Sequence, residues 1–152
     1  MEKTPLGRDI YLALAAVGWA DGHLDAEEAD AIVRTALEEG LALDEIEEIE
    51  HATKHRVDIG IIDRASMSKE DRLFVYAVAS WMTRLDGAIS QREAQTLSRL
   101  GDALKIPERP RQHAEAIVQE VAAMSDDLRP ARYDLPALRR IIGERLRDAQ
   151  GQ

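Results

Sequence analysis

Apolar residues recur at spacings of three and four along most of this chain, which is the period of an amphipathic α-helix. After Asp44, for example, Ile46, Ile49 and Thr53 mark one side of a predicted helix, while glutamates occupy positions between them. No stretch shows the strict alternation of apolar and polar residues that is typical of a half-buried strand. The pattern therefore predicts an all-α fold.

Capping residues divide the chain into about seven predicted helices. A Ser, Thr or Asp before an apolar run is a favoured helix N-cap, and a Pro in the first turn strengthens the signal. Such caps are Thr4, Asp25, Ser68, Ser90 and Asp134. Helices are expected over 5–20, 26–39, 69–85, 91–104 and 113–124, with others starting at 44 and near 135. Residues 58–67 and 128–136 are expected to be irregular or a linker.

Two of these helices are apolar on nearly every side, one in Ile10–Ala20 and the other in Leu73–Met82. A helix of this kind is normally buried all round, so both are expected at the centre of the fold. The first run has 11 residues, fewer than the roughly 20 that span a bilayer. A similar run occurs around residues 75–85, inside the chain, where it cannot be an export signal. We therefore interpret the first run as a buried helix and not as a signal peptide.

The composition favours helices and excludes several kinds of site. The chain has 152 residues, no Cys and only 4% aromatic residues. Without Cys there is no disulfide, no thiolate zinc ligand and no thiol nucleophile, and the chain suits a reducing compartment. We therefore expect a cytoplasmic protein built as one helical bundle, since the length is typical of a single domain.

The net charge of −9 is concentrated in one segment. Residues 21–50 contain 12 acids and one base, Arg34, whereas the other 122 residues carry a net charge of +2. An acidic segment repels phosphate backbones, so we expect no nucleic-acid partner. A basic protein partner and a divalent cation stay open, as does the simpler interpretation of a solvated helix face that keeps the protein soluble.

The strongest internal signal is a repeat at an offset of 65 residues. Residues 21–28, DGHLDAEE, align with residues 86–93, DGAISQRE. In each copy the Gly can take a positive φ after an apolar helix, the Leu or Ile fills the core, and the Asp or Ser caps the next helix. The repeat predicts a bundle with internal pseudo-twofold symmetry.

This pair of Asp-Gly-x-Leu/Ile-Asp/Ser-x-x-Glu motifs, each after an apolar helix, resembles the TerB-like family of tellurite-resistance proteins. It is also similar to the helical region of membrane-linked DnaJ-type co-chaperones. The resemblance covers about residues 5–125 and departs from the family pattern at Arg84 and Leu85. It implies an all-helical, non-enzymatic module of the chemical stress response. Its motif residues here are Asp21, Gly22, Glu28, Asp86, Gly87 and Glu93.

The resemblance also sets the expected domain limits. We expect a TerB-like helical domain over residues 1–125. Residues 126–152 are expected to form a linker and a C-terminal helix that packs on the same domain, with its apolar residues at Leu138, Ile141, Ile142 and Leu146.

Four carboxylates of the two motifs form a candidate metal site. If the repeats converge, Asp21, Glu28, Asp86 and Glu93 would supply hard oxygen ligands for a divalent cation. Turn and capping roles explain the same residues without any metal. The motif also matches the second half of an EF-hand loop. Positions 1 and 3 of that loop would be Val17 and Trp19 in the first copy and Met82 and Arg84 in the second, and none of these offers a carboxylate, which argues against an EF-hand.

No catalytic constellation is visible. His51 and His55 share one helix face, but Ala52 stands where zinc proteases have a Glu, and the helix dipole accounts for both histidines. We expect a non-enzymatic module whose acidic surface binds a divalent cation or a protein partner. A pure interaction adaptor, or a co-chaperone-like module without metal, is the alternative.

Overall fold

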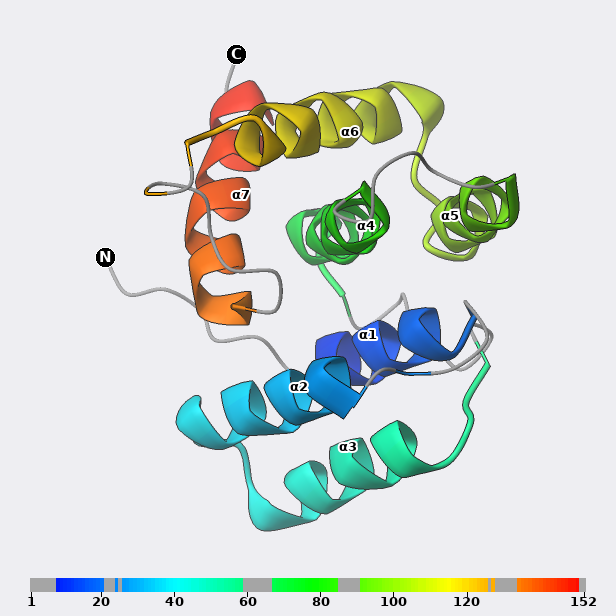
Figure 1. The fold of residues 1–152 in the computed structure, drawn as a ribbon, viewed down its shortest axis with the longest axis vertical. Helices are drawn as coiled ribbons and strands as arrows, with labels where there is room; N and C mark the ends of the chain where they lie inside the picture. The colour runs from blue at the N-terminus through cyan, green and yellow to red at the C-terminus, as the bar shows by residue number, and fades with distance from the viewer. Residues whose placement is uncertain are drawn as a thin grey trace.

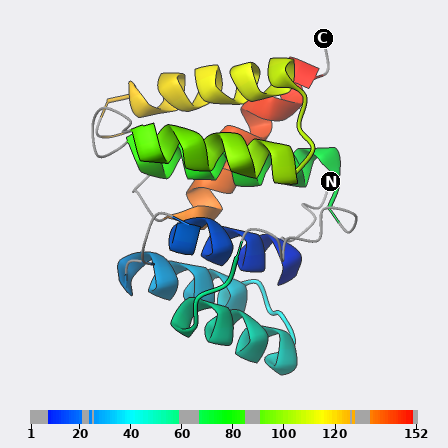
Figure 2. The same cartoon turned by 90° about the vertical axis from the view of Figure 1, so that its right-hand side faces the viewer.

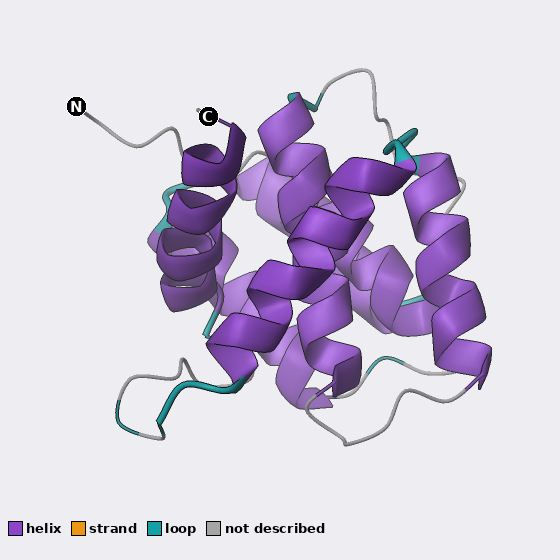
Figure 3. Cartoon of the chain, turned by 90° about the horizontal axis from the view of Figure 1, so that it is seen from above, coloured by secondary structure: helices purple, strands orange, loops and turns teal. Residues whose placement is uncertain are grey.

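The computed structural model of the protein describes residues 8–20, 24, 26–58, 67–84, 91–125, 127 and 134–150. These residues form seven α-helices and no strand, so the predicted all-α bundle is confirmed (Figures 1 and 3). The helices are α1 (Arg8–Ala20), α2 (Ala26–Glu38), α3 (Leu43–Lys54), α4 (Lys69–Arg84), α5 (Gln91–Ala103), α6 (Glu108–Ala122) and α7 (Leu135–Gln150). Within the described ranges, no helix combines the length and the apolar character needed to cross a membrane.

The two apolar helices are central, as predicted. Every residue from Leu73 to Trp81 in α4 is buried, and so is every residue of α1 from Ile10 to Gly18 except the half-buried Leu12. Helix α4 contacts α1, α5, α6 and α7, and α1 contacts α2, α3, α4 and α5. Figure 2 shows the resulting stack, with α6 above α4 and α5, and with α1 above α2 and α3.

The helices form two groups of three, which we call the first triad (α1, α2 and α3) and the second triad (α4, α5 and α6). In the first triad all three helices pack against one another. In the second triad α4 packs on both partners, but the described residues of α5 and α6 make little contact with each other. Helix α7 packs instead on α4, α6 and α2.

Helix bounds repeat between the triads at the offset of 65 residues. Helix α2 begins at 26 and ends at 38, and α5 begins at 91 and ends at 103; α3 begins at 43, and α6 begins at 108. The repeat of the sequence therefore extends through a third helix. Whether a twofold rotation relates the triads stays a prediction, because Asp21-Gly22 and Asp86-Gly87 lie outside the described residues.

Several predicted caps are confirmed by their hydrogen bonds. Ser68 Oγ accepts from the Asp71 backbone N–H at 3.1 Å, and Asp134 Oδ1 accepts from the Ala137 N–H at 3.2 Å. The other three predicted caps, Thr4, Asp25 and Ser90, lie outside the described residues, as does most of the segment expected to be irregular between α3 and α4.

The predicted start of the sixth helix at residue 113 is wrong. Helix α6 begins five residues earlier at Glu108, after Pro107 as its N-cap residue, and Pro110 lies in its first turn. Amide groups in the first turn of a helix have no intrahelical acceptor, so a proline there costs no hydrogen bond. Pro110 is therefore an ordinary first-turn residue of α6.

Helices α2 and α5 end in the same turn. At α2 the Leu41 N–H donates to the Ala36 carbonyl and the Gly40 N–H to the Leu37 carbonyl; at α5 the bonds run from Ile106 to Gly101 and from Lys105 to Asp102. These are the two bonds of a Schellman motif, which needs a left-handed residue after the helix. That residue is Gly40 in the first triad, with φ +79°, and Lys105 in the second, with φ +56°.

Candidate functional site

The described residues include only part of the predicted metal site. Asp21 and Asp86 lie outside the described residues, and Glu93 lies on α5 with a side chain that is not described. Only Glu28 is placed in full, in the first turn of α2, where it is buried. The metal site at Asp21, Glu28, Asp86 and Glu93 therefore stays a prediction.

Glu28 lies against Gly18 of α1. A Cβ atom added at Gly18 would stand 3.1 Å from Glu28 Oε1 and 2.2 Å from Leu24 Cδ1. The missing side chain of Gly18 therefore allows Leu24 and the Glu28 carboxylate to approach α1 closely. Because the carboxylate is turned toward α1, it is not part of the solvent-exposed acidic surface.

The histidine pair lies on one helix face, as its spacing predicts. The rings of His51 and His55 stack with their centroids 4.2 Å apart, and both residues are exposed. Within the described residues, no group of three or more His, Asp and Glu side chains is placed to hold a metal ion.

Two further acids of the 21–50 segment have structural roles. Glu39 Oε1 accepts a hydrogen bond of 2.6 Å from the hydroxyl of Tyr11, which is fully buried in α1. Burial, together with this bond, raises the pKa of the Tyr11 hydroxyl far above its usual value. Glu45 Oε1 accepts from the Ala42 backbone N–H at 3.1 Å and so satisfies a free amide at the start of α3.

Seven acids of α2 and α3 are exposed, and they form what we call the acidic face. Its members are Glu27, Asp30, Glu38, Asp44, Glu47, Glu48 and Glu50. Three bases of the described residues lie beside these seven acids: Arg34 pairs with Asp30 at 2.8 Å and with Glu38 at 3.9 Å, Arg8 lies 3.6 Å from Glu48, and Lys54 lies 3.9 Å from Glu50. The face therefore keeps a strong negative field.

Leu37 and Leu43 interrupt the acidic face on either side of the turn between α2 and α3. They are 55% and 72% exposed, and they are the two large apolar side chains exposed among the described residues. Glu38 and Asp44 directly follow them in sequence. An exposed apolar pair rimmed by charge is a common feature of protein interaction sites.

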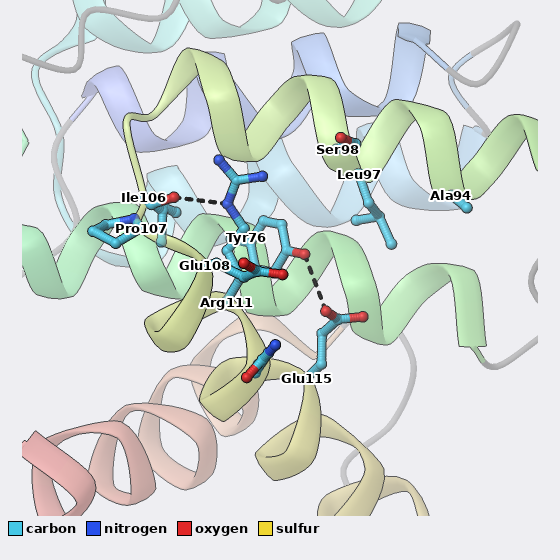
Figure 4. Close-up of a pocket in the computed structure, with 10 residues that line it drawn as sticks. Tyr76, Ala94, Leu97, Ser98, Ile106, Pro107, Glu108, Arg111 and Glu115 are labelled. Atoms are coloured by element: carbon cyan, nitrogen blue, oxygen red, sulfur yellow. Dashed lines mark hydrogen bonds between the residues drawn. The ribbon is translucent and has the colours of Figure 1, made fainter.

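A cleft of about 620 Å³ opens between α4, α5 and α6, where α5 and α6 diverge. Its lining includes Tyr76 of α4, Leu97 and Ser98 of α5, and Arg111 and Glu115 of α6. Figure 4 shows the Tyr76 hydroxyl directed at the Glu115 carboxylate, to which it donates a hydrogen bond of 3.3 Å. The described lining of this cleft offers mixed polar and apolar contacts.

Arg111 holds the turn between α5 and α6 at one end of this cleft (Figure 4). Its Nε donates to the Ile106 carbonyl at 2.7 Å, and its Nη2 donates to Asp102 Oδ1 at 2.9 Å. A Cβ atom added at Gly101 would stand 2.6 Å from the guanidinium group. The guanidinium can therefore occupy this position only because residue 101 has no side chain. Arg111 is therefore a structural clamp.

Sequence reasoning missed the cleft and its residues. One signal was available: Tyr11 and Tyr76 lie 65 residues apart, at equivalent positions of the repeat. Each tyrosine donates a hydrogen bond to a glutamate, but Glu39 directly follows α2, whereas Glu115 lies on α6. The opening of the cleft depends on how α5 and α6 diverge, which local spacing does not encode.

Neither a protein-family model, nor a curated protein, nor a solved structure matches this chain.

Proposed function

We propose that this protein is a non-enzymatic binding module that holds a positively charged protein partner on its acidic face. The observation that carries the proposal is the exposed pair Leu37 and Leu43, set among seven exposed acids. A basic segment with an apolar anchor would match both features. The fold uses Glu28, Glu39 and Glu45 in contacts with its own buried or backbone groups, whereas the seven acids of the acidic face are exposed to solvent.

The resemblance to TerB-like proteins supports a place for this module in the response to tellurite or other chemical stress. The complete lack of Cys supports a reducing compartment such as the cytoplasm. An acidic surface argues against nucleic acid as the partner, because phosphates would be repelled.

The test compares capture of partners by the whole protein and by variants. Replacing Leu43 with Asp and both Glu38 and Asp44 with Lys removes the anchor and reverses the nearby charge. The control reverses two exposed acids elsewhere, Glu108 and Asp127. We expect crosslinked basic proteins to be lost with the face variant and kept with the control, and their binding to weaken as salt rises. Equal capture by both variants would overturn the proposal.

A divalent cation is the second candidate ligand, favoured by the buried Glu28 carboxylate in the first turn of α2. Were Asp21, Asp86 and Glu93 to join it, a cation would bind only the folded state. It would then stabilise that state by about 2.7 kcal/mol at 100 times its dissociation constant. Melting curves with and without calcium, magnesium, manganese or zinc check this. If none of the four ions changes the melting temperature, the metal site is rejected and the adaptor function is kept.

A further inference from the structure

A second cleft, of about 470 Å³, shares Ile106 and Pro107 with the first and lies against the start of α4. Three of its lining residues are cations, Lys69, Arg72 and Lys105. The rest are apolar: Leu73, Ile106, Pro107 and Pro110. No acid is among the described residues that line it, although the chain as a whole carries a charge of −9.

Lys105 lies in the left-handed backbone region, with φ +56°. The equivalent turn of the first triad uses Gly40, which takes that conformation without strain. A lysine is strained there because its Cβ crowds the backbone. Backbone strain of this kind is often found at functional sites, where the strained residue has a role in binding or catalysis. Lys105 lines the cleft.

Arg72 is fixed in place but has unused hydrogen-bonding capacity. Its Nη1 donates to the Leu104 carbonyl at 3.3 Å. Its Nε is enclosed and meets no acceptor in the described part of the chain. A buried donor without an acceptor is unfavourable, and Arg72 is one of the residues that line the cleft.

Lys69 is the first residue of α4. A helix N-terminus carries partial positive charge, so a lysine there does not stabilise the helix. Two of the nearest acids in sequence face other partners: Asp71 lies 4.0 Å from Arg139, and Asp102 lies 2.9 Å from Arg111. The three cations of the cleft therefore add positive charge that these acids do not cancel.

We propose that this cleft binds a small organic oxyanion, such as a phosphate monoester with a compact apolar group. Lys69, Arg72 and Lys105 would hold the oxygens, because cations bind oxyanions through charge-assisted hydrogen bonds. Leu73 and the two prolines would cover the apolar group. The volume lies within the usual range for small-molecule sites, and bare phosphate would leave the apolar wall uncovered. This site is separate from the acidic face.

The test uses phenyl phosphate as the probe and the ¹⁵N-labelled whole protein. We expect amide shifts at 69–73 and 104–110, with inorganic phosphate binding more weakly and phenol not at all. The double variant Lys69→Gln with Lys105→Gly should bind phenyl phosphate at least about tenfold more weakly. Both changes relieve unfavourable features, so the variant should stay folded. The matched control is Arg109→Gln, an exposed cation of α6 that lines neither cleft.

Three results would overturn the proposal. One is equal affinity for phenyl phosphate in the double variant and the wild type. Another is shifts that centre elsewhere or fail to appear at millimolar probe. The third is a combined result, in which the protein sediments with vesicles that contain phosphatidic acid but shows no amide shifts with phenyl phosphate. This result would assign the three cations to a membrane surface.

Discussion

The two triads have the same helix spacing but differ in how their outer helices meet. In the first triad α2 and α3 pack together, whereas α5 and α6 diverge in the second. The difference shows at the equivalent tyrosines: Tyr11 is enclosed, and Tyr76 lines the cleft of about 620 Å³. The closed triad carries its charge on the outside, and the open triad has two clefts. One repeated pattern thus supports two kinds of surface.

The largest expected difference between the triads is in core truncation. Ile32 of α2 and Leu97 of α5 are equivalent residues, 65 apart; Ile32 is fully buried, whereas Leu97 borders the cleft of about 620 Å³. We expect Ile32→Ala to cost about 4 kcal/mol of unfolding free energy and Leu97→Ala about 2, because the cost depends on how fully the site encloses a cavity. Urea denaturation measures both. Equal losses would break the contrast between closed and open triads.

Removing the tyrosine hydroxyl should also cost more unfolding free energy in the first triad than in the second. Tyr11→Phe removes the hydrogen bond from a fully buried hydroxyl to the Glu39 carboxylate and should cost about 2 kcal/mol, since hydrogen bonds to charged groups contribute more than neutral ones. Tyr76→Phe should cost under about 1 kcal/mol, because Glu115 borders a cleft that water can enter. Thermal or urea denaturation of the two variants, both at neutral pH, makes the comparison. A costlier loss at Tyr76 would contradict it.

Alkaline pH gives a second test of the Tyr11 site. The unfolded tyrosine releases its proton near pH 10, whereas burial keeps the folded one protonated to higher pH. The folded state then binds more protons, so its stability is complete below about pH 10 and falls by about 1.4 kcal/mol per pH unit above it. Tyr11→Phe should lack this part of the decline. An identical alkaline slope in wild type and variant would show that Tyr11 is open to solvent.

The contact between Arg111 and Gly101 predicts that Gly101→Ala changes the free energy of unfolding in opposite directions with and without the arginine. In the wild type, Gly101→Ala should destabilise by about 1 kcal/mol, because the new Cβ displaces the guanidinium from Ile106 and Asp102. In an Arg111→Ala background the same change should stabilise by about 1 kcal/mol, since Ala is the better helix former. Four melting curves complete the cycle. Additive effects would mean that Arg111 does not lie over Gly101.

The smallest effects concern the two left-handed turn residues. Gly40→Ala should destabilise by about 1 kcal/mol, and Lys105→Gly should stabilise by up to about 1 kcal/mol, because only glycine takes this conformation without strain. Denaturant midpoints distinguish the two signs. A loss of stability in Lys105→Gly would show that the lysine side chain contributes more to the turn than its backbone strain costs.

Much of the fold was predictable because helix signals are local. Apolar runs predicted the two buried helices, and Ser68 and Asp134 predicted helix starts that their hydrogen bonds confirm. The start of α6 was not predictable in this way, because a proline occurs both at helix boundaries and in the first turn of a helix.

The sequence by itself determined the helices, their repeat spacing and the concentration of acids between residues 21 and 50. Which of those acids turn toward the core depends on how the helices pack: Glu28 lies against Gly18, and Glu39 accepts a hydrogen bond from Tyr11, 28 residues away in sequence. The tertiary structure also decided that Lys69, Arg72 and Lys105 share a cleft. The reason is physical, since periodicity fixes the side of a helix on which a residue lies, whereas a neighbour from a distant segment depends on how whole helices pack.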